Sequence, residues 1–312
     1  MNNKSKTEKI KYGYSLKLFS KDWQLWIMIL PAIAVIFIFN YIPMYGIQLA
    51  FREFNFAKGI TGGEFAGLKY FEKFITSYQF PTLMRNTITL CLSNIVFGFP
   101  APILLALIIN QIRNKRLRGI LQTTVYLPHF ISMVVMVSLL LVLFNSNTGI
   151  IGKVLSMTGL SERNLLGSTS TFVGVYVVSE IWQHCGWNSI IYLSALSSVD
   201  TQLYDAAKID GANRWNIVRY IDIPQLIPTI IILFILQMGN LLNTGFEKIF
   251  LMQNNLNLPV SEVIATYTYK IGIQSNQFSY AAAIGLFNTM INFLFLVIVN
   301  RISKKVANIS LW

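Results

Sequence analysis

The sequence predicts an all-α membrane protein with six transmembrane helices and both termini in the cytoplasm. Three observations lead to this fold class. Only 12% of the 312 residues are charged and 54% are hydrophobic, whereas about 25% of the residues in a typical soluble domain are charged. Six long stretches carry no charge or a single one, and the basic residues favour one side of the topology that these stretches define.

The first three predicted spans lie within residues 23–51, 86–112 and 119–152, which contain no Asp, Glu, Lys or Arg. Each is longer than the roughly 20 helical residues that cross a hydrocarbon core of about 30 Å. The first apolar run is too long for the hydrophobic part of a secretory signal peptide and lacks a cleavage pattern of small residues. We therefore expect it to remain as the first helix.

The last three predicted spans lie within residues 164–199, 223–246 and 271–300. The fourth contains a single charged residue, Glu180, and the other two contain none. An even number of spans places both ends of the chain on the same side. The predicted organisation is therefore a tail at 1–22, a transmembrane domain at 23–300, and a second tail at 301–312.

The distribution of Lys and Arg predicts which side of the membrane the termini occupy. Short cytoplasmic loops of membrane proteins carry an excess of basic residues. Sixteen of the 25 basic residues lie on the same side as the termini, in segments 1–22, 113–118, 203–224 and 301–312. This bias places both termini in the cytoplasm. Because the net charge of +12 is spread over separate segments, it does not predict a nucleic-acid partner.

The longest outer connection covers residues 46–85 and is rich in aromatic residues and glycine. It is too short for a domain of independent size. We expect it to form a small ordered cap on the outer side.

Motifs for catalysis are absent from the sequence. The nearest approach to a nucleotide-binding P-loop, at residues 149–154, has too few residues between its glycines and no Ser or Thr after Lys153. No HExxH, CxxC or GxSxG motif occurs. Cys91 and Cys185 lie in separate apolar stretches and suggest neither a disulfide framework nor a metal site. We therefore predict a protein that is not an enzyme, with no catalytic residue and no metal or cofactor of its own.

The cytoplasmic segment 203–224 predicts two short helices separated by a turn. Gly211 tolerates the left-handed backbone conformation at a helix end, and Asn213 can cap the helix that follows. Ala206 and Ala207 leave one surface of the first helix without bulky side chains, so another backbone can approach closely.

Apolar side chains on the second of these helices are candidates for a contact with a partner. Trp215 and Val218 are three residues apart and are expected to project from one helical face. Pro224 suits the first turn of the fifth span. A short helix that exposes an aromatic side chain, and that membrane helices hold at both ends, is a plausible element for transmitting movement.

This segment resembles the EAA loop of binding-protein-dependent ABC importer permeases. The matching residues are Asp205-Ala206-Ala207, Gly211 four positions on, and Ile221-x-Ile223-Pro224 after nine more residues. Asp at 205 and Ile at 223 replace the Glu and Leu of the usual pattern. Shorter matches place the chain near the sugar-permease branch, the LplB-like and MalF-type permeases; they occur at 67–71, 86–87, 99–102, 126–132, 245–250 and 311–312.

The resemblance implies the fold of a type I ABC importer permease in a bacterial plasma membrane. It implies four partners: a second permease in a heterodimer, a pair of ATPases that bind ATP and Mg, an extracellular substrate-binding protein, and a saccharide. In this family the loop docks in a groove of the ATPase. Carried over, the coupling residues are Asp205, Ala206, Ala207, Gly211, Trp215, Ile221 and Pro224. The alternative is an amphipathic surface helix without a partner.

A polar stripe in the fourth span predicts part of a substrate pathway. Ionisable residues inside a membrane are costly and are functional candidates by default. On helical spacing the stripe comprises Glu180, His184, Trp187 and Asn188. The fifth span contributes Gln237, Asn240, Asn243 and Thr244 in the same outer half, so both groups can line one cavity.

Alternatives to this pathway stay open at the level of sequence. Glu180 and His184 can instead satisfy each other or a neighbouring helix through hydrogen bonds. The saccharide contacts can also lie mainly on the second permease. A protein of another class, an ion-gradient-driven secondary transporter or channel, usually carries charged relays in several spans, whereas Glu180 is alone here. A membrane scaffold without transport is a third hypothesis.

Overall fold

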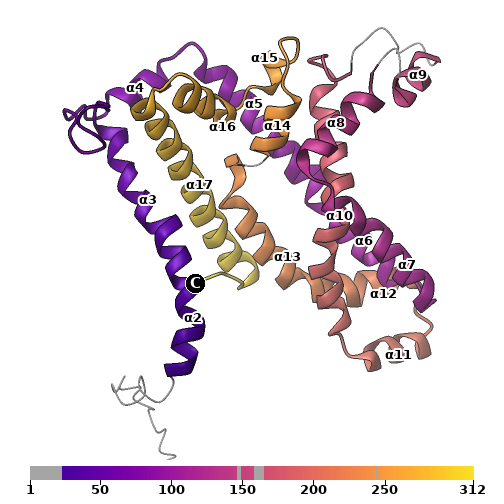
Figure 1. The fold of residues 1–312 in the computed structure, drawn as a ribbon. Helices are drawn as coiled ribbons and strands as arrows, with labels where there is room; N and C mark the ends of the chain where they lie inside the picture. The colour runs from indigo at the N-terminus through magenta and orange to yellow at the C-terminus, as the bar shows by residue number, and fades with distance from the viewer. Residues whose placement is uncertain (1–22, 146–148, 158–164, 244) are drawn as a thin grey trace, which may run out of the picture. The chain divides into compact units, whose positions relative to one another are not determined.

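The computed structural model describes residues 23–145, 149–157, 165–243 and 245–312 (Figure 1). Throughout these ranges the regular elements are helices, and β-structure is limited to two isolated bridges, Arg52 with Phe65 and Asn55 with Gly59. The predicted all-α fold class is confirmed. The chain divides into two compact units, residues 1–48 and residues 49–312, which are described separately.

The described part of the first unit is one long apolar helical run. Helix α2 (Trp23–Ile36) passes through a π-helical turn (Phe37–Tyr41) into α3 (Ile42–Met44) and a 3-10 turn (Tyr45–Phe51) that reaches the second unit. Together they form a 29-residue candidate span, as predicted for the first apolar run.

The second unit begins with the outer connection. After the bridge between Arg52 and Phe65, helix α4 (Lys69–Ile75) leads to α5 (Phe80–Ser93). A π-helical turn (Asn94–Gly98) joins α5 to α6 (Pro100–Asn110), and the two helices form the second candidate span.

The predicted third span is broken. Helix α7 (Lys115–Tyr126) and its 3-10 extension (Leu127–Phe130) meet α8 (Met133–Leu143) at a bend of 97°. Pro128 lies in the 3-10 turn, and the extended Ser132 starts α8 by accepting a hydrogen bond from the Val135 amide. The uncharged stretch therefore folds as two helices that run in different directions, because Ser132 begins a second helix within it.

Helix α10 (Phe172–Ser197) forms the predicted fourth span and has 26 residues. It is not among the helices that are apolar enough to qualify as spans on their own, because Glu180, Gln183, His184 and Asn188 interrupt it. Within the described residues four helices qualify, and a fifth does so if α7 and α8 count as one span. The predicted number of six spans is therefore not confirmed.

The fifth and sixth spans differ from their predicted bounds. Helix α12 (Arg214–Ile217) continues through a π-helical turn (Val218–Asp222) into α13 (Ile223–Met238), so the span begins nine residues earlier than predicted. Helix α17 (Phe278–Ala307) extends seven residues into the predicted C-terminal tail. Lys304 and Lys305 occupy its last turn, where basic side chains interact favourably with the helix dipole.

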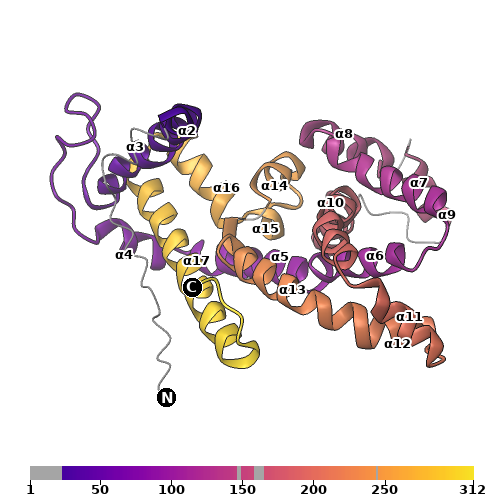
Figure 2. The same cartoon turned by 90° about the horizontal axis from the view of Figure 1, so that it is seen from below.

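Helix α10 is central in the packing of the second unit. It packs against α6, α7 and α13, as Figure 2 shows from below. One buried cluster joins α6, α10 and α13; its members are Ala106, Leu107, Ile109, Tyr192, Leu193, Leu196 and Leu226. The approach to α7 is so close that a Cβ at Gly186 would lie 1.9 Å from the Val125 carbonyl oxygen.

The remaining short helices lie at the two ends of this unit (Figure 1). Helix α11 (Thr201–Ile209) and α12 form one end. Helices α4, α14 (Phe246–Met252), α15 (Leu258–Ser261) and α16 (Ile264–Tyr269) lie toward the other. A π-helical turn (Lys270–Gln274) leads from α16 toward α17, and α9 (Ile150–Met157) follows α8.

Candidate functional site

The coupling loop, residues 203–224, contains the turn that the sequence predicts. Gly211 has φ of 75°, in the left-handed region. The Ala212 amide donates to the Ala207 carbonyl (2.8 Å) and the Gly211 amide to the Lys208 carbonyl (3.1 Å). This pair of hydrogen bonds is the Schellman arrangement, which satisfies the free carbonyls at the end of a helix. The glycine therefore ends α11 and reverses the chain.

The second helical part of the loop is the first turn of the spanning helix. The Asn213 side chain caps α12 by accepting a hydrogen bond from the Asn216 amide at 2.8 Å, as predicted. Because α12 runs on without a break into α13, Trp215 is rigidly connected to the fifth span. Pro224 lies within this continuous helix, directly after the π-helical turn Val218–Asp222, so its missing N–H falls where the regular hydrogen-bond pattern is already altered rather than at a helix start as predicted.

The end of the coupling loop is apolar and exposed. The side chains of Trp215 and Ile209 are 67% and 87% exposed, and Leu203 is exposed as well. Val218 lines the same cavity as Trp215, so the two side chains share one face as predicted. Val218 is only half-buried and also packs against the cluster of α6, α10 and α13, so it is less exposed than Trp215.

The other predicted coupling residues divide by exposure. Asp205 is exposed and pairs with Lys208 at 2.7 Å within α11. Ala206 is exposed, whereas Ala207 and Ile221 are half-buried. Of the two small side chains, only Ala206 is therefore exposed on the surface of α11.

A buried carboxylate that the sequence analysis did not identify holds the loop in place. Asp222 is completely buried and accepts hydrogen bonds from Tyr204 (2.7 Å), from Gln111 (2.8 Å) and from Asn110 (3.4 Å). It thereby joins α11, the end of α6 and the start of α13. In the sequence Asp222 marks only the charged boundary of a span, so its partners could not be recognised.

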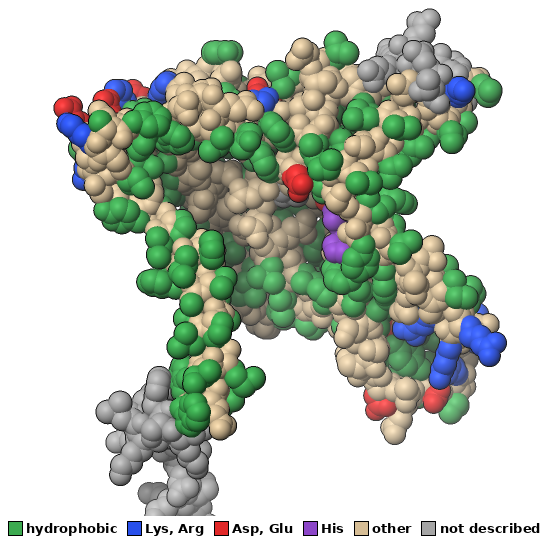
Figure 3. Space-filling view, viewed as in Figure 1, with side chains coloured by type: hydrophobic (Ala, Val, Ile, Leu, Met, Phe, Trp, Pro, Cys, Tyr) green, Lys and Arg blue, Asp and Glu red, His purple; other side chains and the backbone are tan. Residues whose placement is uncertain are grey.

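Two cavities flank the coupling loop. The larger, of about 980 Å³, lies between the turn after α6 and α11, and is lined by Arg113, Tyr204 and Asn213 among others. The second, of about 640 Å³, lies beside Trp215 and Leu117. Figure 3 shows Lys and Arg side chains over this end of the molecule, where α7, α11 and α12 lie. The loop is therefore accessible to a partner from more than one side.

The membrane cavity, of about 230 Å³, lies between the π-helical turn after α5 and the helices α6, α10 and α13. Four of the eight residues predicted for the substrate pathway line it, namely Glu180, His184, Asn188 and Gln237. Asn94 contributes a further amide from the π-helical turn after α5. The structure thus brings Glu180, His184 and Asn188 of the fourth span together with Gln237 of the fifth span in one cavity, as predicted.

Three of the other four predicted pathway residues do not line this cavity. Trp187 stacks on His129 at 4.5 Å between ring centroids. Asn243 accepts a hydrogen bond from Asn288 of α17, and Asn240 lies just beyond the end of α13. Helix α13 ends at Met238, so Asn240 and Asn243 are not on a face of this helix, as the prediction assumed they would be. Thr244 lies outside the described residues.

Glu180 is bound by side chains from two directions. Its carboxylate accepts a hydrogen bond from Lys248 Nζ at 2.8 Å and lies 3.6 Å from His184 Nε2. His184 Nδ1 is 3.1 Å from His129 Nδ1, which belongs to the 3-10 turn after α7. The network therefore links α14, α10 and α7, in agreement with the interhelical alternative for Glu180 and His184.

Lys248 is the residue of this network that the sequence analysis missed. It is completely buried on α14, and its ammonium group also lies 3.4 Å from the Tyr176 carbonyl oxygen. Lys248 lies in the short match at 245–250, but its contact with α10 depends on the tertiary fold and has no local signal in the sequence. Among the described residues no group of His, Cys, Asp and Glu could hold a metal ion.

Spanning helices around a small polar cavity, with an exposed apolar loop at one end, define a membrane transport component. The chain belongs to the family of binding-protein-dependent transport system inner membrane components, whose profile matches residues 98–308. It is thus a multi-pass membrane protein and a transport subunit rather than an enzyme, as predicted.

Curated relatives cover almost the whole chain. The polygalacturonan/rhamnogalacturonan transport system permease protein YteP of Bacillus subtilis is 39% identical over 93% of this chain and 90% of its own length. The protein LplB of the same organism is 37% identical over 91% of this chain and 90% of its own length. The predicted resemblance to LplB-like sugar permeases is confirmed.

Solved structures agree with this assignment. A chain of a bacterial ABC transporter involved in the import of the acidic polysaccharide alginate matches with a TM-score of 0.85 and 36% identity, over 93% of this chain and 98% of that chain. A second structure is the alginate transporter in complex with an alginate pentasaccharide-bound periplasmic protein. It matches with a TM-score of 0.86 and 36% identity, over 95% of this chain and 99% of the other.

Proposed function

We propose that this protein is the permease subunit of an ATP-driven importer of saccharides. The observation that carries the proposal is the coupling loop, in which an exposed Trp215 is rigidly connected to a spanning helix. Relatives of similar length are permeases for polygalacturonan and rhamnogalacturonan, and the matching structures belong to an alginate importer. These names support an oligosaccharide as the cargo.

The partners follow from the same reasoning. A pair of ATPases binds ATP and Mg and receives the coupling loop, with Trp215 and Ile209 as apolar contacts. A second permease completes the pathway as a heterodimer, and an extracellular binding protein delivers the saccharide. The solved alginate transporter is in complex with an alginate pentasaccharide-bound periplasmic protein, which supports this last partner.

The membrane cavity supplies this chain's part of the pathway. Sugar hydroxyls require both hydrogen-bond donors and acceptors. The side chains of Asn188 and Gln237 offer both, and Glu180 offers an acceptor whose charge Lys248 balances. With about 230 Å³, the cavity is too small for an oligosaccharide. The second permease or a conformational change must therefore complete it.

Copurification tests the docking step. The tagged chain is extracted in mild detergent from cells that also make the ATPase, and the ATPase retained is quantified. We expect Trp215→Ala to reduce retention about ten-fold or more, since a buried aromatic anchor contributes 2 kcal/mol or more to an interface. Trp182→Ala, a half-exposed Trp on α10 far from the loop, is the matched control and should retain the ATPase.

Uptake into vesicles tests the cargo and the energy source. The assembled permeases, ATPases and loaded binding protein should take up short oligogalacturonides, alginate oligosaccharides or arabino-oligosaccharides only when ATP is present. Uptake driven by an ion gradient without ATPase would instead establish the secondary-transporter alternative. Absence of uptake for all three saccharides would contradict the proposed substrate class.

A further inference from the structure

A pocket of about 300 Å³ lies at the end of the second unit that is opposite the coupling loop. We call it the outer pocket. It lies between the start of α5 and the connection from α14 through α15 to α16; its lining comprises Tyr78, Gln79, Thr82, Leu83, Asn255, Leu258, Pro259 and Glu262. Small-molecule sites occupy roughly 300–1,000 Å³. The outer pocket can therefore hold one unit of a saccharide rather than a whole chain.

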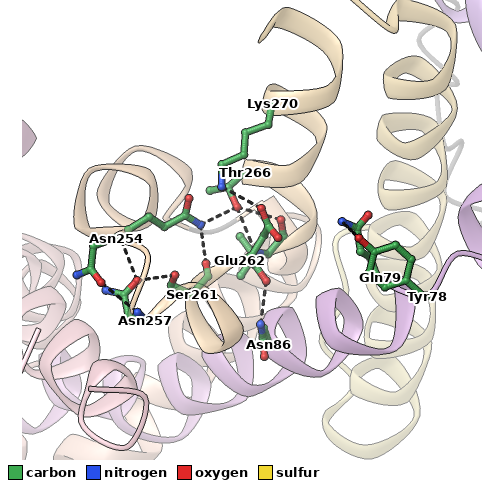
Figure 4. Close-up of polar contacts among 11 residues, drawn as sticks. Tyr78, Gln79, Asn86, Asn254, Asn257, Ser261, Glu262, Thr266 and Lys270 are labelled. Carbon is green, nitrogen blue, oxygen red and sulfur yellow. Dashed lines mark hydrogen bonds and ion pairs between the residues drawn. The ribbon is translucent and has the colours of Figure 1, made fainter. Parts of the chain in front are cut away.

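One wall of the outer pocket is fixed by buried hydrogen bonds. Asn86 Nδ2 donates to the carbonyl oxygens of Pro259 (3.0 Å) and Glu262 (2.9 Å). The buried Asn257 accepts from the Ser261 hydroxyl at 2.9 Å and donates to the Met252 carbonyl at 2.9 Å. Figure 4 shows Glu262 between this network on one side and Tyr78 with Gln79 on the other. The wall is thus preorganised, which lowers the entropic cost of binding.

The opposite wall presents an aromatic ring and an amide. The Tyr78 side chain is 87% exposed, and its hydroxyl accepts a hydrogen bond from Gln79 Nε2 at 3.1 Å. A ring this exposed is accessible to a ligand, and covering its apolar surface is favourable. Because a pyranose ring has an apolar face, it can pack on such a ring.

Polar groups in the outer pocket are available for hydroxyl groups. In the part of the chain that the structure describes, the side chains of Thr82 and Asn255 have no hydrogen-bond partner. Glu262 Oε1 is paired with Lys270 Nζ at 2.9 Å. The carboxylate can therefore accept hydrogen bonds while the ammonium group balances its charge. The pocket therefore offers donors and acceptors without excluding a neutral or an acidic sugar.

From this geometry we propose that the outer pocket binds one sugar unit of the imported saccharide before the chain enters the membrane cavity. The inference rests on the proposed function. Tyr78 packs on the sugar ring, and Thr82, Asn255 and Glu262 bind its hydroxyl groups. The pocket is a subsite at the outer end of this chain, separate from the cavity around Glu180.

Direct binding to the assembly without its binding protein tests the proposal. Permeases and ATPases in nanodiscs are titrated with short oligogalacturonides, alginate oligosaccharides and arabino-oligosaccharides, and binding is followed by saturation-transfer NMR. The saccharide that the complete assembly takes up fastest should bind. Tyr78→Ala should weaken its binding about five-fold and Asn255→Ala about three-fold, whereas Tyr78→Phe, which keeps the ring, should stay within about two-fold.

Control variants and uptake distinguish failure of this inference from failure of the proposed function. Phe65→Ala removes another exposed aromatic ring, outside the outer pocket, and should leave binding unchanged. If a saccharide is taken up but its binding is absent, or is equal in wild type and Tyr78→Ala, the subsite is refuted and the proposed function stands. Binding that requires the binding protein would make the pocket a docking surface for that protein and would also refute the subsite. If none of the three saccharides is taken up, the proposed function fails, and the subsite fails with it.

Discussion

The Tyr204 hydroxyl donates a hydrogen bond of 2.7 Å to the buried carboxylate of Asp222. Tyr204 belongs to α11, and Asp222 lies at the start of α13. The same carboxylate accepts a hydrogen bond of 2.8 Å from Gln111 at the end of α6. A displacement of α11 therefore acts on two membrane helices, which is the mechanical link that the proposed coupling requires.

Removing this hydroxyl should loosen the link. Tyr204→Phe keeps the ring but leaves the Asp222 carboxylate with fewer donors, and a hydrogen bond to a charged group contributes about 1.5–3 kcal/mol. We expect faster amide hydrogen exchange in α11 and less uptake per ATP hydrolysed. Tyr220→Phe, an exposed Tyr for which the structure describes no hydroxyl hydrogen bond, is the control. Unchanged exchange in Tyr204→Phe would show that the bond does not hold the loop.

The same contact should be visible in an alkaline titration. Burial, followed by the hydrogen bond to Asp222, raises the pKa of Tyr204 to about 12 from its ordinary value of 10. Because the folded state favours the protonated phenol, the contribution to stability is complete below pH 10 and is lost as the pH rises toward 12. The difference in tyrosinate absorbance between wild type and Tyr204→Phe should stay near zero up to about pH 10.5. A half-developed signal at pH 10 would contradict this.

Gly211 should tolerate only residues that accept its backbone conformation. A Cβ would meet no atom within 4 Å, so the cost of substitution comes from φ of 75° rather than from crowding. A β-branched residue in the left-handed region costs roughly 1–2 kcal/mol. Gly211→Val should uncouple ATP hydrolysis from uptake while membrane insertion stays normal, and Gly211→Asn should preserve most uptake. Normal uptake by Gly211→Val and by Gly211→Trp would exclude a role of this turn in coupling.

The Glu180 and Lys248 pair should behave as one unit. Lys248→Met leaves a carboxylate in the membrane cavity without its ammonium partner, and removing one member of a buried pair costs about 3–5 kcal/mol. Glu180→Gln leaves a buried ammonium group. We expect each single variant to lower the thermal unfolding temperature more than the double variant does. Additive effects would show that the two residues are not coupled.

Gly186 should be intolerant of any side chain. A Cβ there would lie 1.9 Å from the Val125 carbonyl oxygen, so α10 and α7 would have to separate. Overpacking of this kind costs about 1–3 kcal/mol. Gly186→Ala should lower the thermal stability of the protein in detergent. Gly174→Ala, also on α10 but with open space around it, should be nearly neutral. Equal stability of the two variants would refute the close packing.

Local signals in the sequence were sufficient for the turn within the coupling loop. Gly211 and Asn213 act through hydrogen bonds within a few residues, so their roles as helix end and cap follow from residue type and spacing. The helical fold class was equally predictable, because few charged residues and long apolar stretches allow little else in a membrane. The polar stripe of α10 was also predictable, since helical spacing alone places Glu180, His184 and Asn188 together.

Tertiary structure alone decided which groups meet across long separations. Lys248 reaches Glu180 from 68 residues away, and Gln111 reaches Asp222 from 111. The 97° bend between α7 and α8 likewise divides a stretch whose composition is uniformly apolar. Residue type fixes whether a segment prefers lipid and where a helix can end, because these are local properties of the chain. The partner of a buried charge depends on how helices pack, and that arrangement is set by side-chain contacts distributed over the whole bundle.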